Sequence, residues 1–113
     1  MTLPKNATKV EVENATVEFL TYIENEQKYI YFDTSIFGPP EPMLNGMLGL
    51  QLIENSDAIL IMINHKPPMG IFPRIEENYE YEILEENGLA KIIFKYKNGT
   101  TANTDYSSNS CGG

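Results

Sequence analysis

Short apolar runs at strand spacing alternate with one longer helical pattern along the chain. Residues 16–23 and 28–32 are rich in β-branched and aromatic side chains, and the polar stretch 24–27 separates them. Two such runs joined by a short polar loop predict a β-hairpin. Residues 58–63 are continuously apolar, which is typical of a central strand covered on at least part of both faces.

A helix is expected between the hairpin and the central strand. Pro39, Pro40 and Pro42 mark its start, because proline has a helical φ and lacks an N–H that the first turn would not use. Apolar residues then repeat at spacings of three and four up to Leu52, a pattern typical of an amphipathic helix. The polar segment that begins at Asn55 predicts its end.

Two glycines, Gly46 and Gly49, lie three positions apart within this helical pattern. Each costs the helix up to about 1 kcal/mol relative to alanine. We expect close approach of a neighbouring element to the helix face that the two glycines share. Sulfur-containing and aromatic side chains are expected to pack in the core or beneath the helices: Met43, Met47, Met62, Met69, Tyr29, Tyr31, Tyr79 and Tyr81. The alternatives are a soft-metal or adaptable binding surface for the methionines and an aromatic face for a partner for the tyrosines.

The second half of the chain ends in a predicted hairpin. Pro73 restricts the helical pattern before it to a short helix that begins near this proline. Residues 79–84 alternate apolar and acidic side chains, as expected for a strand with one wet face. Asn87-Gly88 is the preferred type I′ turn because both residues tolerate positive φ, and residues 89–96 form the returning strand.

The predicted order of elements is β-α-β-α-β-β with an extra N-terminal strand. Helices between strands and a closing hairpin predict an α/β fold of the α+β two-layer sandwich type, with a mixed sheet and helices on one face. With 113 residues there is room for a single domain. We expect residues 1–15 to be a flexible segment, 16–97 the α/β domain, and 98–113 a disordered tail.

The charge of the chain excludes several classes of partner. Its formal net charge is −8, and six glutamates lie between positions 76 and 86. This acidic surface would repel a phosphate backbone, so nucleic acid is not expected as a partner. An anionic membrane surface is disfavoured for the same reason. No apolar run approaches the ~20 residues that a membrane-spanning helix needs.

The cysteine count limits the cellular setting and the cofactors. The single cysteine, Cys111, excludes an intramolecular disulfide and a metal site built from several cysteines. No secretion signal is evident in residues 1–5. We therefore expect a reducing, cytoplasmic setting, and no cofactor is indicated.

A proline-rich motif, Gly38-Pro39-Pro40-Glu41-Pro42, follows Asp33 at the start of the first predicted helix. With this motif and the predicted order of elements, residues 31–96 resemble the TusA/SirA family of small sulfur carriers. Members share the β-α-β-α-β-β order and carry Cys-Pro-x-Pro at the start of the first helix, shortly after a strand that contains an aspartate. Here Asp33 precedes Gly38-Pro39-Pro40-Glu41-Pro42, so the Pro-x-Pro falls at Pro40 and Pro42. The resemblance places Pro39 where the family has its cysteine.

A branch of that family shares the loss of the cysteine and shows a histidine followed by a proline-rich turn after the second strand. His65-Lys66-Pro67-Pro68 is similar to that feature. In the sulfur carriers, the helix N-terminus stabilises the thiolate that accepts a persulfide sulfur. Proline has no thiol, so sulfur transfer by the family's route is excluded at Pro39.

The leading hypothesis is a non-enzymatic binding domain related to the sulfur carriers. Its candidate binding residues are Pro39, Pro40, Glu41, Pro42 and His65, and its partner is a protein or a small ligand. The alternative roles of these residues are structural, because the prolines suit a rigid helix start and His65 suits a loop that it holds by hydrogen bonds. The oligomeric state stays open.

Two other hypotheses remain. The chain ends in Cys111-Gly112-Gly113, so a sulfur carrier or redox relay could act through Cys111 and Gly113 on the tail. A hydrolytic or metal enzyme centred on His65 is the third. It is disfavoured because one histidine gives no metal-ligand spacing.

Overall fold

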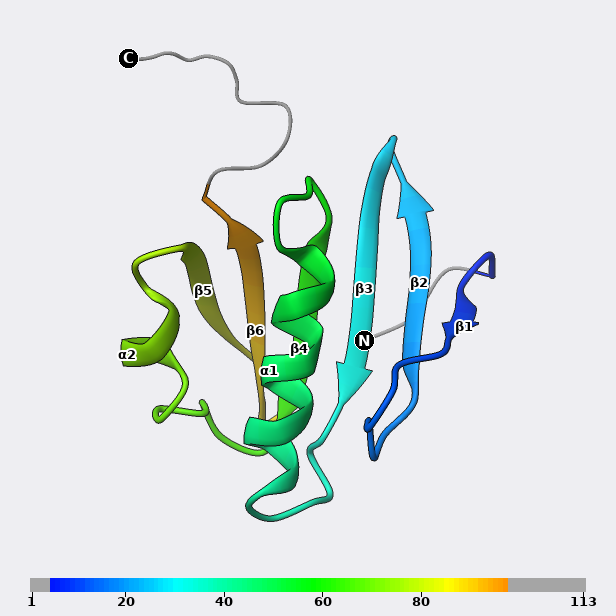
Figure 1. The fold of residues 1–113 in the computed structure, drawn as a ribbon. Helices are drawn as coiled ribbons and strands as arrows, with labels where there is room; N and C mark the ends of the chain where they lie inside the picture. The colour runs from blue at the N-terminus through cyan, green and yellow to red at the C-terminus, as the bar shows by residue number, and fades with distance from the viewer. Residues whose placement is uncertain (1–4, 98–113) are drawn as a thin grey trace.

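Strand β4 (Ile59–Asn64) lies near the middle of a six-stranded mixed sheet in the computed structural model, which describes residues 5–97 (Figure 1). The strand order across the sheet is β1-β2-β3-β4-β6-β5. The other elements are β1 (Thr8–Val10), β2 (Phe19–Glu24), β3 (Gln27–Asp33), α1 (Glu41–Ile53), α2 (Phe72–Ile75), β5 (Tyr79–Glu86) and β6 (Leu89–Tyr96).

The predicted two-layer α+β fold is confirmed. From β3 onward the elements follow the order β-α-β-α-β-β. The sheet is mixed because β3 and β4 are parallel while every other neighbouring pair is antiparallel. Helix α1 supplies the crossover that a parallel pair requires. It lies across the sheet in front of β4 and β6 (Figure 1).

The N-terminal part of the fold differs from the expected flexible segment 1–15. Two strands were predicted before the first helix, and the structure has one more. Thr8–Val10 form this additional strand, β1, and its Val10 pairs with Phe19 of β2. Val12, Ala15 and Val17 of the following loop pack against the core. Three residues are too few to show strand alternation in the sequence, and the pairing with β2 creates the strand.

Both tight hairpin turns depend on residues with positive φ. Asn87 and Gly88 have φ values of 57° and 79°, as the sequence predicted for a type I′ turn. Asn25 and Glu26 join β2 to β3 with φ values of 53° and 68°. The polar stretch predicted as a loop is therefore a two-residue turn, in which only the first residue is a favoured type for positive φ.

Two neighbouring elements approach helix α1 closely at its glycines, as predicted: the loop before α2 at Gly46 and strand β4 at Gly49. A Cβ atom on Gly46 would lie 2.7 Å from Cδ1 of Ile71, and one on Gly49 would lie 3.0 Å from both δ-carbons of Leu60. Leu60 is fully buried, so it has little room to move away. The cost of the two glycines to the helix is thus offset by contact that larger residues would prevent.

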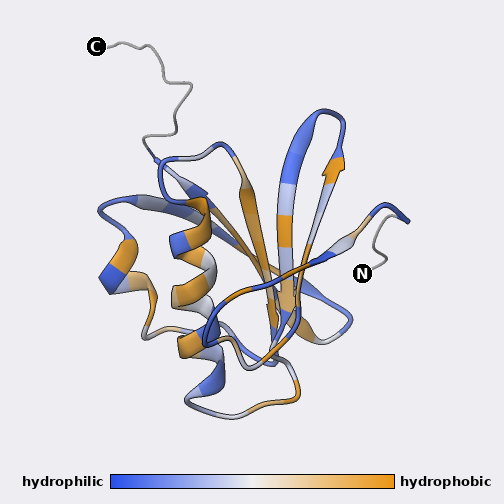
Figure 2. Ribbon diagram, turned by 45° about the vertical axis from the view of Figure 1, so that its right-hand side comes forward, coloured by the Kyte–Doolittle hydropathy of each residue, from blue (hydrophilic) through white to orange (hydrophobic). Residues whose placement is uncertain are grey.

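The core lies between the helices and the sheet face that they cover, here called the helix face. It is visible in Figure 2 as apolar ribbon along the central strands beneath α1. Its fully buried large side chains come from the strands, α1 and the loop before α2: Phe19, Phe32, Phe94, Leu50, Ile53, Leu60, Met62, Ile71 and Ile92. Phe72 of α2 stacks on Tyr81 of β5, with ring centroids 4.1 Å apart.

Three of the residues expected in the core or beneath a helix are placed otherwise. Tyr29 and Tyr31 alternate with the buried Ile30 and Phe32 on β3, so they lie on the opposite, open face of the sheet. Met69 is 67% exposed. It follows Pro67-Pro68 in a loop, where the helical spacing that placed it in the core does not apply.

Asn45 is a buried polar residue that joins α1 to the N-terminal loop. Its Oδ1 accepts a hydrogen bond from the N–H of Thr16, and its Nδ2 donates to Oγ1 of Thr16 and to the carbonyl of Glu41. All three distances are 3.0 Å or less. This side chain therefore fixes the path of the segment between β1 and β2.

Candidate functional site

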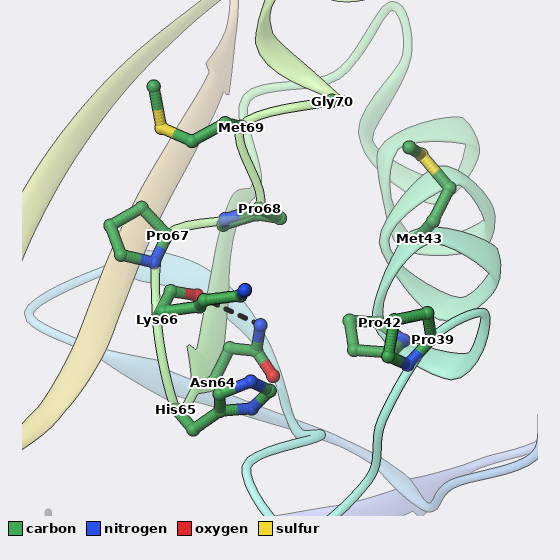
Figure 3. A pocket seen from close by; sticks show the side chains of 10 residues that line it. All are labelled: Pro39, Pro42, Met43, Asn64, His65, Lys66, Pro67, Pro68, Met69 and Gly70. Atoms are coloured by element: carbon green, nitrogen blue, oxygen red, sulfur yellow. Dashed lines mark hydrogen bonds between the residues drawn. The ribbon is translucent and has the colours of Figure 1, made fainter.

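A pocket of about 390 Å³ lies where α1 begins and β4 ends (Figure 3). The start of α1 and the loop after β4 form its two walls, which lie on opposite sides in Figure 3. The lining residues are Pro39, Pro42, Met43, Asn64, His65, Lys66, Pro67, Pro68, Met69 and Gly70. Open α/β sheets place ligands at this position, at the carboxyl ends of the strands.

Hydrogen bonds between the ends of β3 and β4 fix one side of this pocket. Thr34 follows β3, and its hydroxyl lies 3.1 Å from both Oδ1 of Asn64 and the carbonyl of Ile63. Nδ2 of Asn64 donates to the carbonyl of Lys66 at 2.9 Å. Thr34 and Asn64 are both buried, so this network holds the first residues of the loop in place.

The loop from residue 64 to residue 70 continues in a tight turn. The N–H of Met69 donates to the carbonyl of Pro67, and the N–H of Ile71 donates to the carbonyl of Pro68, each at 3.0 Å. A Cβ atom on Gly70 would lie 2.9 Å from Cε of Met43. The glycine therefore allows the methionine side chain of α1 to contact this loop.

The start of α1 offers few donors to a ligand. The N–H of Glu41 already donates to the carbonyl of Gly38, and Pro42 has no N–H. The N–H of Leu44 donates to the carbonyl of Pro40. Within the described chain, only the N–H of Met43 remains unused in the first turn. An anion site at a helix N-terminus needs several such donors, so the proline-rich start is poorly suited to bind an anion.

The structure brings together some of the residues singled out from the sequence. Pro39, Pro42 and His65 line one pocket, although 23 positions separate Pro42 from His65. Pro40 and Glu41 do not line it. Successive helical residues point about 100° apart, so the residues of one helix turn cannot all face the same pocket. Glu41 instead accepts a hydrogen bond from Asn45 through its carbonyl.

Cys111 and Gly113 lie outside the described residues. Three pocket residues were not foreseen from the sequence: Met43 and Met69, which were expected in the core, and Gly70. Asn64 could be placed near His65, because it directly follows a continuously apolar strand, where a polar residue marks the edge of the sheet.

Exposed apolar side chains lie on both segments that meet at the pocket. Met69 is 67% exposed, and Ile36 is 86% exposed on the loop that leads to Pro39. Phe37, next to Ile36, is 37% exposed. The basic residues His65 and Lys66 are exposed at the pocket, and no carboxylate lines it. The site is thus mostly apolar with basic groups on one side.

A second, smaller hollow of about 160 Å³ lies on the open face of the sheet and is polar. Tyr31, Asp33, Glu86 and Lys91 are among its lining residues. Burial raises the pKa of the Tyr31 hydroxyl above its ordinary value, and the nearby carboxylates of Asp33 and Glu86 add to this effect. Tyr31 therefore stays protonated in this hollow at neutral pH.

Two kinds of feature are absent from residues 5–97. No group of three or more His, Cys, Asp or Glu side chains in this range is arranged to hold a metal ion. Neither helix in this range has the length and apolar character needed to cross a bilayer.

Comparison with protein-family models, with curated proteins and with solved structures finds no match to the chain.

Proposed function

We propose that this protein is a non-enzymatic binding domain that takes an apolar side chain of a protein partner into the pocket between α1 and residues 64–70. The observation that carries the proposal is the pocket itself, with its volume of about 390 Å³ and its lining of prolines and methionines. Ligand-binding sites are concave, mostly apolar and in the range of ~300–1,000 Å³.

A protein partner is favoured over a free small ligand by the surroundings of the pocket. Met69 lines the pocket and is largely exposed, and Ile36 and Phe37 are exposed on the loop that leads to Pro39, another lining residue. Contiguous exposed apolar surface marks interaction sites in soluble proteins. A small ligand would fill the pocket and leave the Ile36 side chain in water. The surface of a partner protein would cover both the pocket and Ile36.

The chemistry of the site supports binding rather than catalysis. The pocket residues that can act as a base are His65 and Lys66, and no carboxylate, hydroxyl or thiol is present among the lining residues. A nucleophile and base within hydrogen-bond reach are the signature of covalent catalysis. Methionine adapts its shape to different apolar partners, which suits Met43 and Met69 to recognition.

The relationship to the TusA/SirA family is part of the same proposal. The β-α-β-α-β-β order from β3 onward supports it, as does the Pro-x-Pro at the start of α1. In this view the scaffold and the helix start are retained, and the thiol that defined sulfur transfer is replaced by Pro39. We place the protein in the cytoplasm, in keeping with its single cysteine.

Methionine methyl groups provide a direct test. We would label them with carbon-13 and add N-acetyl-leucinamide and N-acetyl-phenylalaninamide, two neutral probes that present an apolar side chain on a peptide unit. Saturable shifts of the Met43 and Met69 methyl signals are expected, while Met62, which is fully buried in the core, should not shift. N-acetyl-serinamide, which lacks an apolar side chain, is the control probe.

A pair of variants separates the pocket from the rest of the surface. His65→Ala should alter the affinity for the apolar probes, whereas Gln51→Ala, exposed near the other end of α1, should not. The proposal fails if neither Met43 nor Met69 responds to any apolar probe. It fails equally if all methionine signals shift together, since that outcome indicates non-specific association.

A further inference from the structure

Strand β5 forms one edge of the sheet and is open along its outer side. It has eight residues and pairs with β6 without interruption from Tyr79↔Tyr96 to Glu86↔Leu89. In an antiparallel pair, alternate residues direct their N–H and C=O groups away from the partner strand. Within residues 5–97, no hydrogen bond outside the pairing with β6 uses the backbone of residues 79–85.

Three of the usual devices that protect an edge strand are missing from β5. Natural edges are often short, bulged or interrupted by proline, but β5 is long, has a continuous register and contains no proline. Tyr81 and Ile83 on its helix face are 38% and 41% exposed. Acidic side chains are the remaining device, and they determine which strand could pair with this edge.

Carboxylates line β5 on the open face of the sheet. Glu80 and Glu82 are exposed there. Strand β6, the neighbour of β5 within the sheet, supplies complementary charge. Lys95 lies opposite Glu80, and Lys91 forms an ion pair with Glu86 at 3.9 Å. Along the open face of β6, Lys91 and Lys95 alternate with Leu89 and Ile93, and the residues between them are apolar. Strand β6 therefore shows which kind of strand pairs well with β5.

A second copy of this chain does not fit the outer edge. An antiparallel pair of β5 strands that continues the sheet would place Glu80 and Glu82 of one copy across from the acidic side chains of the other. Like charges directly opposite one another destabilise a sheet. The formal net charge of −8 adds a general repulsion between copies.

We infer that β5 is a docking edge for an extended basic segment of a partner protein, which adds a strand beside β5 and alternates lysine or arginine with apolar residues. Backbone hydrogen bonds along the strand provide the contact, and side chains on alternate positions select the partner. The basic side chains face Glu80 and Glu82, and the apolar ones cover Tyr81 and Ile83. This inference does not depend on the pocket at α1.

The test uses the whole chain and a capped peptide that alternates lysine and valine. Two-dimensional amide NMR should show saturable shifts along residues 79–86 and none along β1, the other edge of the sheet. A peptide of the same sequence with alternate amides N-methylated keeps its charge. It loses the backbone N–H donors along one edge of the extended peptide. It should bind at least about tenfold more weakly if backbone pairing provides the contact.

Matched charge variants complete the design. Glu80→Gln combined with Glu82→Gln should weaken the unmodified peptide by about threefold to tenfold. Glu11→Gln combined with Glu13→Gln removes the same charge from exposed residues near β1 and should leave the affinity unchanged. Equal binding of both peptides, or equal loss in both double variants, would show general charge attraction and overturn the inference. A concentration-dependent dimer formed through β5 would overturn it as well.

Discussion

Thr34 and Asn64, 30 positions apart in the chain, share a buried hydrogen bond of 3.1 Å that joins the ends of β3 and β4. Asn64 in turn holds the carbonyl of Lys66, so this contact connects the parallel pair at the middle of the sheet to the loop that forms the pocket. The shape of the candidate site thus depends on two buried polar residues: Asn64, which lines the pocket, and Thr34, which does not.

Replacement of Thr34 by valine tests this connection. Thr34→Val keeps the shape of the side chain and leaves Oδ1 of buried Asn64 without its donor. We expect a loss of about 1–2 kcal/mol in the free energy of unfolding, measured by urea denaturation. Thr8→Val, at an exposed position of β1, is the matched control and should change stability little. Equal stability of Thr34→Val and the wild-type protein would show that the hydrogen bond is energetically unimportant.

The contact between Gly49 and Leu60 gives a second prediction. Gly49→Ala improves helix propensity by about 1 kcal/mol, but its Cβ would lie 3.0 Å from both δ-carbons of Leu60 and 3.3 Å from Cε2 of Phe19. Overpacking of a core costs about 1–3 kcal/mol. We therefore expect a net destabilisation of about 1–2 kcal/mol in thermal or urea unfolding.

Gly38→Ala is the control for this substitution. No atom lies within 4 Å of a Cβ at Gly38, so this change should have little effect on stability. A stabilised Gly49→Ala variant would mean that the sheet and α1 separate readily and that the close approach is not important for packing.

The glycine pair was predictable because its spacing and its cost are properties of the helix alone. The same is true of the Asn87-Gly88 turn and of the short helix near Pro73, where local backbone chemistry decides the structure. Burial of Asn45 was not predictable. A polar residue in an amphipathic pattern usually faces solvent, and only the loop from β1 shows why this one is buried.

The candidate site was predictable to a similar extent. The meeting of Pro39 and His65 followed from topology, since a helix start and a strand end meet at the same edge of a sheet in this fold. The orientation of Glu41 depended on the exact rotation of α1, which the sequence does not define. Met69 was misplaced because a periodicity of three also occurs by chance across a proline-rich loop.

Asn45 itself provides a third prediction. Asn45→Ala removes the acceptor for the N–H of Thr16 and the donors to Oγ1 of Thr16 and the Glu41 carbonyl. We expect a loss of about 1–3 kcal/mol in the free energy of unfolding. Amide hydrogen exchange at Thr16 should also become faster, because the loop between β1 and β2 loses its connection to α1.

Gln51→Ala is the control in the same helix, because Gln51 is exposed. Gln51→Ala should leave the free energy of unfolding and the rate of amide hydrogen exchange at Thr16 unchanged. Unaltered exchange at Thr16 in Asn45→Ala would mean that the loop is held by its apolar contacts, such as those of Val12 and Val17, rather than by Asn45.

The sulfur-carrier alternative makes an opposite prediction from the binding proposal. An acceptor thiolate attacks the outer sulfur of a desulfurase persulfide, forms a new S–S bond and releases the desulfurase thiolate. The binding proposal predicts an unchanged intact mass after incubation with a cysteine desulfurase and cysteine. A gain of one sulfur atom that a thiol reductant reverses, and that Cys111→Ser abolishes, would instead support transfer through the tail.

The hydroxyl of Tyr79 predicts how stability depends on alkaline pH. It donates to the carbonyl of Leu50 at 3.0 Å. Burial raises its pKa above the ordinary value of 10.0, and electrostatic interaction with Glu54 and Tyr96 adds to this effect. The folded protein therefore holds this proton more tightly than the unfolded chain. The resulting stabilisation is fully present below about pH 10 and is lost as the pH rises through the folded-state pKa.

Tyr79→Phe separates the hydrogen bond from the titration. At about pH 8 the variant should be less stable by about 1 kcal/mol, because the Leu50 carbonyl loses its donor. Between about pH 9 and pH 11 its free energy of unfolding should fall less steeply than that of the wild-type protein, since phenylalanine has no proton to lose. Tyr22 and Tyr31, whose pKa values burial also raises, retain part of the slope in both proteins. Parallel curves for the two proteins over this range would show that the Tyr79 proton is held no more tightly in the folded state.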